Sequence, residues 1–231
     1  MKFKTQSVFL IFIVTSILSS CMSEPKDDYI INDVLFESDG YRPTDFNSIT
    51  SDNLELIWSE TFENNNRNWT LQNDYKTYKS EIKNGQYVLT NYSNDNAYSF
   101  TQPSEIDQSR DFQITASVKL IQNKSTGLMV KSGTEFILMM VNKTRQVYVT
   151  HYYDGSYHDV KLVDKFEEPQ NSTSFNTFVI RKIYGKYYFY INGLYTGIEY
   201  ENSSTIDRVG FFLNADAGMI IEDINVDYIN F

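Results

Sequence analysis

The feature that most constrains the fold is a strict two-residue alternation between Phe112 and Leu120. Phe112, Ile114, Ala116, Val118 and Leu120 are apolar, and polar residues stand between them. This is the period of a β-strand with one buried face and one solvated face. An α-helix would instead place apolar residues three or four positions apart. The run therefore predicts a strand that covers a core with one side only.

Similar short runs recur along the rest of the chain, separated by turn residues. Asn84-Gly85, Asp154-Gly155 and Asn192-Gly193 favour tight hairpin turns, because Asn, Asp and Gly tolerate positive φ angles. No segment shows a convincing 3.6-residue apolar stripe. The predicted fold class is therefore all-β, an antiparallel β-sandwich or barrel with at most short helical insertions. Further strands are expected at residues 136–141, 146–150, 178–183, 187–191, 209–213 and 219–229.

The first 20 residues have the organisation of a secretory signal peptide. Two lysines precede an apolar stretch of 11 residues, 8–18, which is too short to span a bilayer. Leu18-Ser19-Ser20-Cys21 resembles the lipobox of bacterial lipoproteins, which implies cleavage before Cys21 and lipidation of that residue. The alternative is an ordinary thiol in a signal peptide that is cut elsewhere. Cys21 is the only cysteine, so no disulfide can stabilise the fold.

The chain is expected to divide into a signal peptide at 1–20, a lipidated cysteine with a polar tether or docking segment at 21–51, and a β-domain at 52–231. Met22 stands where the inner-membrane retention signal of Gram-negative lipoproteins has an aspartate. Lys26-Asp27-Asp28 resembles the export signal of Bacteroidota surface lipoproteins. These resemblances imply a bacterial outer-membrane lipoprotein that is exposed at the cell surface. A solvated charged linker is the alternative.

The net charge of the chain limits the classes of partner that it is expected to bind. The 231 residues contain 20 basic and 30 acidic side chains, and removal of residues 1–20 leaves 18 and 30, a net charge near −12. Such a chain lacks the basic surface that nucleic acid requires, and an anionic bilayer would repel it. Nucleic acid is therefore not expected as a partner, and contact with a membrane is expected through the lipid anchor only.

A series of local patterns resembles concanavalin A-like jelly-roll domains of the lectin, laminin-G and glucanase type. The first is an acidic-x-Phe strand that leads through an Asn-rich turn to a tryptophan, Glu60-Thr61-Phe62 to Trp69. The resemblance covers residues 55–231 and implies two curved antiparallel sheets with paired terminal strands. Trp58 and Trp69 are assigned to the core and to packing of the first loop. Other matching segments are Asn84-Gly85-Gln86-Tyr87, Ile106-Asp107 with Asp111 to Ile114, Gly127-Leu128-Met129, Tyr190 to Gly193, Val209 to Phe212 and Ile224 to Asp227.

One segment resembles half of a catalytic motif. Laminarinase-like glycosidases on this scaffold carry Glu-x-Asp-x-x-Glu, and Glu105-Ile106-Asp107 matches its beginning, but Arg110 stands where the second glutamate should be. Retaining hydrolysis needs two carboxyl groups about 5 Å apart, so the substitution removes the acid/base partner. No catalytic residue is therefore predicted, and the segment is interpreted as a polar lead-in to the strand at Phe112.

Two histidines form a weaker candidate site. His151 and His158 flank the Asp154-Gly155 turn, and Asp159 follows the second histidine. Two imidazoles and a carboxylate could bind a transition metal if the turn brought them together. An exposed polar pair near a hairpin tip is the alternative.

Tyrosine is the most prominent candidate for ligand binding, with 18 copies in the chain. If Val147 and Val149 point inward, Tyr148 and Tyr152 lie on the opposite face of their strand, and the same alternation turns Tyr188 and Tyr190 outward. Neighbouring strands would then present four tyrosines as a platform for sugar rings. The alternative is that these tyrosines merely cover a sheet.

The jelly-roll resemblance also implies a structural calcium ion near the paired termini. Glu60, Glu63, Asp223 and Asp227 are its candidate ligands, with solvated surface acids as the alternative reading. No other cofactor is expected.

The predicted function is that of a cell-envelope lipoprotein that binds a glycan or an envelope protein without catalysis. Two alternatives from other classes remain open. One is a carbohydrate-active hydrolase on the same scaffold, with dispersed acids, and the other is a purely structural accessory subunit of a surface complex.

Overall fold

The structure is a computed structural model that describes residues 42, 44–74, 76–102, 105–121, 124–142, 146–163, 174–201 and 205–231. The predicted signal peptide, Cys21 and the tether as far as Tyr41 lie outside the described residues. Within these ranges, no helix has the length and apolar character that crossing a bilayer requires.

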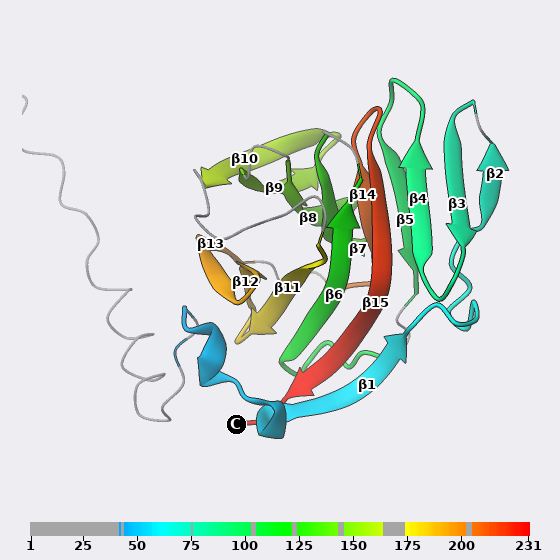
Figure 1. The fold of residues 1–231 in the computed structure, drawn as a ribbon. Helices are drawn as coiled ribbons and strands as arrows, with labels where there is room; N and C mark the ends of the chain where they lie inside the picture. Colours follow the sequence, from blue (N-terminus) through cyan, green and yellow to red (C-terminus); the bar gives the residue numbers. More distant parts are fainter. Residues whose placement is uncertain are drawn as a thin grey trace, which may run out of the picture. The chain divides into compact units, whose positions relative to one another are not determined.

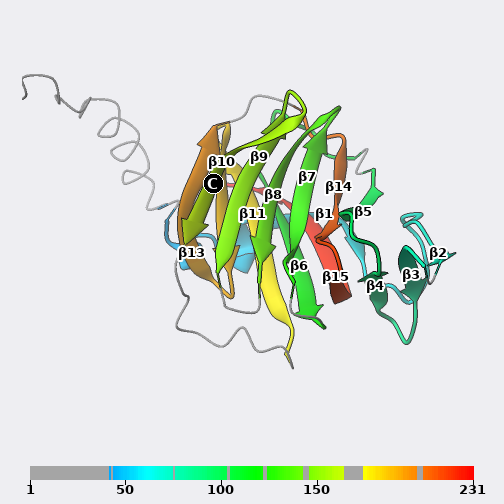
Figure 2. The ribbon, with the colours of Figure 1, turned by 90° about the horizontal axis from the view of Figure 1, so that it is seen from above.

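The described residues form two antiparallel sheets stacked as a sandwich (Figure 1). One sheet has nine strands and the other has six, and Figure 2 shows β9, β8 and β7 of the six-stranded sheet lying over β11 and β6 of the nine-stranded sheet. The predicted all-β antiparallel sandwich is therefore confirmed. In spatial order the nine-stranded sheet is β13 (Leu194–Glu201), β12 (Lys186–Ile191), β11 (Asn176–Ile183), β6 (Phe112–Leu120), β15 (Gly218–Ile229), β4 (Tyr87–Asn91), β3 (Tyr78–Ile82) and β2 (Gln72–Asp74), with β1 (Leu54–Glu60) paired to β15; the six-stranded sheet is β10 (Ser156–Val163), β9 (Val147–Tyr153), β8 (Glu135–Val141), β7 (Thr126–Ser132), β14 (Arg208–Leu213) and β5 (Ala97–Thr101).

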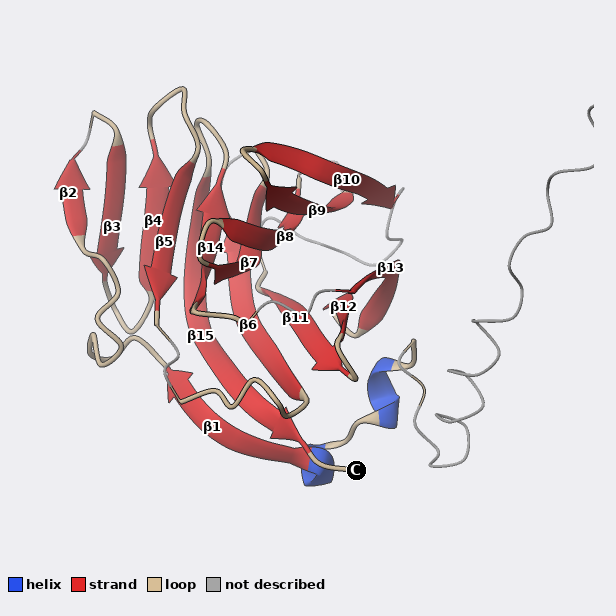
Figure 3. Ribbon diagram, turned by 180° about the vertical axis from the view of Figure 1, so that it is seen from behind, coloured by secondary structure: helices blue, strands red, loops and turns tan. Residues whose placement is uncertain are grey.

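The terminal strands of the domain lie side by side, as the jelly-roll resemblance implies. β1 (cyan) runs along the last part of β15 (red) in Figure 1, with Leu54 opposite Ile229 and Glu60 opposite Ile224. The first part of β15 pairs instead with β4. Two short 3₁₀ helices, η1 (Phe46–Ser48) and η2 (Ser51–Asn53), precede β1 and are blue in Figure 3.

The core fills the space between the two sheets. The alternating apolar residues of β6 all point into it, so the clearest sequence prediction is confirmed. Val147 and Val149 of β9 meet them from the six-stranded sheet. Trp58 and Trp69 are both buried, as predicted, and Trp69 packs 5.5 Å from Tyr87 between ring centroids. Burial of this many aromatic and aliphatic side chains supplies the main stabilisation of a domain without disulfides.

The predicted turn dipeptides make hairpins. Asp154 and Gly155 have φ angles of 50° and 76° and join β9 to β10. Asn192 and Gly193 have φ angles of 52° and 79° and join β12 to β13. These backbone conformations are the left-handed ones that Asp, Asn and Gly adopt at low cost.

The beginning of the described chain covers part of the outer face of the nine-stranded sheet. The Phe46 ring packs edge-on against Tyr190 of β12 at 5.5 Å, and the Arg181 guanidinium of β11 lies 4.5 Å from the Phe46 ring centroid. Arg181 also donates to the Phe46 carbonyl oxygen (3.1 Å) and to Gln113 Oε1 (2.6 Å). This cover lies over a buried arginine, Arg181, and a buried tyrosine, Tyr190, on the side of the sheet away from the sandwich core.

Candidate functional site

The outer face of the six-stranded sheet carries a cluster of aromatic side chains, which we call the aromatic face. Its members come from three separate parts of the sheet: β5, β8 and the β9–β10 hairpin. Tyr98 and Tyr157 are 38% and 42% exposed, whereas Phe136 between them is nearly buried. The aromatic face consists of Tyr98, Phe100, Phe136, Tyr152 and Tyr157.

The rings hold one another in fixed orientations. Phe136 stacks on Tyr152 with centroids 4.6 Å apart and planes within 4°, and Tyr157 meets both of them edge-on. Tyr98 packs against Phe136 at 6.0 Å, and its hydroxyl lies 3.4 Å from that of Tyr157. Offset and edge-on contacts of this kind are favourable and restrict rotation of the rings. The rings therefore support one another's orientation through contacts within the protein itself.

Two open hollows lie on either side of Tyr98 and Phe100. The larger, of about 610 Å³, is bordered by all five rings together with Lys131. The smaller, of about 500 Å³, is more polar and is bordered by Arg67, Asn68 and Arg208 as well as by the Tyr98–Phe100 ridge. The larger hollow, with its aromatic rings and few polar groups, has a volume and lining that are common in ligand sites.

The aromatic residues of β5 face outward because polar residues occupy its inner face. The Ser99 hydroxyl is buried and lies 2.7 Å from the Tyr87 hydroxyl, and Thr101 donates to the Arg67 carbonyl oxygen at 2.7 Å. The inner positions of β5 are thus satisfied by hydrogen bonds. This inverts the usual rule that aromatic residues point inward, so reading the strand by hydrophobicity alone misses the site. The hairpin turn at Asp154-Gly155 could have indicated part of this site from the sequence, because pairing of the strands on either side of the turn places Tyr152 opposite Tyr157.

The phenol of Tyr98 stays protonated in this setting. Burial raises the pKa of its hydroxyl well above the ordinary value, and the neighbouring Tyr157 hydroxyl raises that pKa further. A neutral hydroxyl can both donate and accept a hydrogen bond. The rim of the larger hollow therefore offers polar groups next to apolar ring faces.

The four tyrosines of the predicted platform are not brought together. Tyr148 and Tyr152 share the outer face of β9, as the alternation predicts, but β12 belongs to the other sheet. Tyr188 and Tyr190 do point away from the core, yet they are only 3% and 0% exposed. Phe46, Arg181 and Tyr195 cover them. The prediction that these four tyrosines form a single platform is therefore wrong, and only Tyr152 of the four lies in the aromatic face.

Tyr148 lies farther along the same face of β9. Its hydroxyl donates to Gln146 Oε1 at 2.9 Å and accepts from Asn142 Nδ2 at 3.2 Å. These bonds join the ends of β8 and β9, so its hydroxyl already has partners within the protein.

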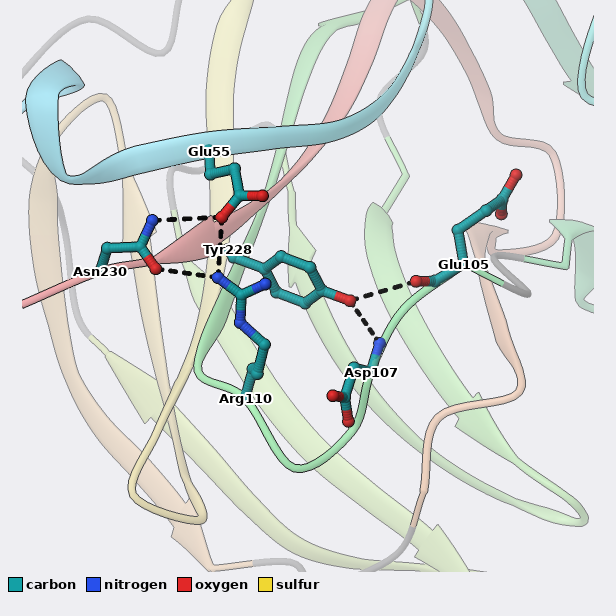
Figure 4. Close-up of polar contacts among 6 residues, drawn as sticks. All are labelled: Glu55, Glu105, Asp107, Arg110, Tyr228 and Asn230. Atoms are coloured by element: carbon teal, nitrogen blue, oxygen red, sulfur yellow. Dashed lines mark hydrogen bonds and ion pairs between the residues drawn. The ribbon is translucent and has the colours of Figure 1, made fainter.

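The segment that resembles a catalytic motif is a structural clasp (Figure 4). Glu105 and Asp107 lie in the loop before β6 instead of on a strand. The Tyr228 hydroxyl donates to the Glu105 carbonyl oxygen at 3.1 Å and accepts from the Asp107 backbone N–H at 2.6 Å. The loop is thereby fixed to the end of β15 through its backbone, and the carboxylates take no part in these bonds.

Arg110, which replaces the second glutamate, completes the clasp. Its guanidinium lies 3.6 Å from the centroid of the Tyr228 ring and donates to Glu55 Oε2 (2.8 Å) and Asn230 Oδ1 (2.9 Å). These contacts join the loop to β1 and to the residue after β15, and the Glu55 pKa is lowered mainly by the hydrogen bond from Arg110. The arginine therefore has a structural reason to stand at this position.

The four candidate calcium ligands do not form one site. Glu60 is buried, and its two oxygens accept from the backbone N–H groups of Phe62 (3.1 Å) and Arg67 (3.0 Å), which shapes the first loop. Asp223 lies opposite Ser117, and Asp227 lies opposite Leu56. Glu63 lies beside Gly85. Among the described residues, no group of three or more His, Cys, Asp and Glu side chains is arranged to hold a metal ion.

The two histidines face each other across the β9–β10 hairpin. His158 stacks on Tyr153 at 3.8 Å and lies 2.8 Å from the Ser156 hydroxyl, whereas His151 lies 3.8 Å from Glu135. The hairpin therefore brings them together, but in the part of the chain that the structure describes they form no metal-binding group. The side chain of Asp159 lies outside the described residues.

Comparisons with known proteins place the fold among concanavalin A-like jelly rolls. No protein-family model matches the chain, and no curated protein is significantly similar to it. Among solved structures, the catalytic domain of an endo-1,3-β-glucanase (laminarinase) from Thermotoga petrophila is 14% identical, with a TM-score of 0.57 over 76% of this chain and 98% of that one. The carbohydrate binding module CBM66 from Bacillus subtilis is 15% identical, with a TM-score of 0.51 over 71% and 97%. A protein from work on mucin-degrading endo-acting O-glycanases of human gut bacteria is 11% identical, with a TM-score of 0.54 over 76% and 100%. Identities this low show a shared fold, and the chain is a concanavalin A-like jelly-roll sandwich.

Proposed function

We propose that the aromatic face is a non-catalytic binding site for a glycan. The observation that carries this proposal is the gathering of five aromatic rings around one open hollow on the outer face of a sheet. Sugar rings pack their C–H surfaces on aromatic faces and require hydrogen-bond partners at the ring edge. Tyr98 and Tyr157 offer both, since their rings line the hollow and their hydroxyls meet at its rim.

Binding is favoured over hydrolysis by the chemistry of the lining. Glycoside hydrolysis ordinarily requires two carboxyl groups on either side of the scissile bond. None of the described residues that border the two hollows is acidic. The names of the similar structures support a carbohydrate ligand, because they include a carbohydrate binding module as well as glucanases.

A glycan array followed by titration of the best ligand tests the proposal. Tyr157→Ala and Tyr98→Ala should each weaken binding about tenfold or more, the usual result of truncating a central aromatic contact. Tyr92→Ala is the matched control, because Tyr92 is 41% exposed but lies beyond the end of β4 in the other sheet. Its affinity should equal that of the unaltered protein.

Two outcomes would overturn the proposal. If no glycan binds and cross-linking recovers a stable partner protein, the aromatic face serves an accessory subunit. If a bound glycan is hydrolysed and the activity disappears on changing a single acid, the protein is an enzyme.

We also propose that Cys21 carries a lipid that anchors the domain to an outer membrane, with the aromatic face available outside the cell. The support is the lipobox-like sequence of residues 18–21 and the lack of any other cysteine. Replacing Cys21 with Ser should move the protein from the membrane fraction to the soluble fraction. Mass spectrometry that finds no fatty acid on the amino terminus of the processed protein would contradict this anchor.

A further inference from the structure

Three cationic side chains border the two hollows in a protein that is acidic overall. Lys131 borders the larger hollow, and Arg67 and Arg208 border the smaller one. The chain has a net charge of −10, so a group of cations with no acid among the described lining residues is a local reversal of sign. Such a reversal attracts anions to one place while the rest of the surface repels them.

Lys131 and Arg208 are neighbours across two paired strands. Arg208 of β14 lies opposite Lys131 of β7, so both side chains project from the same outer face. The Lys131 ammonium lies 5.3 Å from the centroid of the Phe100 ring, which places it at the edge of the aromatic face. A ligand over the rings would therefore meet this pair of charges.

These two cations are not neutralised within the described part of the chain. Arg67 has a carboxylate partner, since its Nη1 lies 2.6 Å from Glu105 Oε1. Neither Lys131 nor Arg208 lies within 4.0 Å of a carboxylate oxygen of any described residue. Adjacent like charges without a counter-charge repel each other, so a ligand that supplies an anion relieves that repulsion.

We infer that the ligand of the aromatic face is an anionic glycan, whose carboxylate or sulfate group binds between Lys131 and Arg208 while its sugar rings pack on Tyr98, Phe100 and Tyr157. This inference rests on the proposed function and names the class of its ligand. The guanidinium of Arg208 can donate two parallel hydrogen bonds to either anion, and the Lys131 ammonium adds a point charge.

The inference is tested by titrating the purified full chain with three probes: a neutral β-1,3-glucan, hyaluronan, which carries carboxylates, and chondroitin sulfate, which adds sulfate groups. One or both anionic chains should bind at least tenfold more tightly than the neutral glucan at low salt. That preference should shrink as sodium chloride is raised from about 0.05 to 0.5 M, because salt screens exposed charges. Comparison of the two anionic probes identifies which anion is preferred.

Charge-removing variants locate the effect. Arg208→Gln and Lys131→Gln should each weaken binding of the anionic probe about tenfold, the equivalent of one lost charge-assisted contact, and weaken any binding of the neutral glucan by much less. Lys119→Gln is the control, because Lys119 is a half-buried lysine on β6 of the other sheet. Its affinity for every probe should match that of the unaltered protein.

The failure of the inference and the failure of the proposed function give different results. If Tyr157→Ala weakens binding but the anionic probes have no advantage and Arg208→Gln changes nothing, the glycan site stands and the anionic ligand is wrong. If no probe or other glycan binds, both proposals are overturned. A carbodiimide cross-link from Lys131 to Glu24, Asp27 or Asp28 of the same chain would then show that this cation contacts the tether.

Discussion

The two outer faces of the sandwich contain the same types of residue but differ in how far those residues are exposed to solvent. On the nine-stranded sheet, Arg181 and Tyr190 are buried beneath Phe46 from the chain's own amino-terminal segment. On the six-stranded sheet, Tyr157 and Arg208 border open hollows. An aromatic and cationic face is thus structural where Phe46 covers it, and it is open to solvent where none of the described residues does. The comparison shows that accessibility, more than residue type, distinguishes the two.

Removing the buried arginine should have the largest effect. Arg181→Ala deletes hydrogen bonds to Gln113 and to the Phe46 carbonyl together with two cation–π contacts, at 4.5 and 4.8 Å, so we expect unfolding to require roughly 3–5 kcal/mol less free energy. Urea denaturation followed by tryptophan fluorescence measures this loss. Arg208→Ala is the counterpart on the open face and should change stability by less than about 0.5 kcal/mol. Equal losses for the two variants would contradict the distinction between the faces.

Removing the cover itself should have an intermediate effect. Phe46→Ala leaves Arg181 in place but deletes the ring that packs on Tyr190, and we expect a loss of roughly 1–2 kcal/mol. Tyr190 should then react with tetranitromethane, which mass spectrometry of tryptic peptides detects. Phe231→Ala is a suitable control, because Phe231 also stacks on a tyrosine, Tyr184, but is exposed. An unreactive Tyr190 in Phe46→Ala would mean that other groups close this face.

The fold was accessible from the sequence because its determinants are local. The alternation in β6 and the turns at Asp154-Gly155 and Asn192-Gly193 each depend on a few neighbouring residues. The inward direction of Val147 and Val149 follows from the same alternation. Each of these features is set within one strand or hairpin, and each agrees with the structure.

The site was not accessible in the same way, because it depends on contacts between distant segments. Alternation predicts that Tyr188 and Tyr190 leave the core, but it contains no information about Phe46, which lies more than a hundred residues earlier. Alternation also cannot assign β9 and β12 to different sheets, since that follows from strand order. Tyr98 and Phe100 were not predicted from the sequence, because the polar side of β5 is the inner one. Ser99 and Thr101 point inward and make hydrogen bonds there, so the two aromatic side chains point outward.

The smallest expected effect concerns the charge of Asp227, on the covered sheet. Burial raises the pKa of its carboxyl, so the folded state holds a proton more tightly than the unfolded state does. Stability contributed by this group is therefore complete below pH 4 and declines as pH rises above the ordinary aspartate pKa of about 3.9. Asp227→Asn should stabilise the protein at pH 7 by no more than about 0.5 kcal/mol, because the side chain is only half-buried and solvent screens part of the effect.

Thermal unfolding of Asp227→Asn between pH 3 and pH 7 measures this gain and its pH dependence. The gain should vanish near pH 3, where the aspartate is protonated in both states. Asp107→Asn should show the opposite sign near neutral pH, since hydrogen bonds from the Ser109 hydroxyl and backbone N–H lower the pKa of that exposed carboxyl. A gain for Asp227→Asn that is the same at every pH would show that packing of the amide, and not removal of a desolvated charge, causes it. The outer surface of the nine-stranded sheet would then not disfavour the charged form of the Asp227 carboxyl. The contrast between the outer faces of the two sheets would then depend on Phe46 and Arg181 alone.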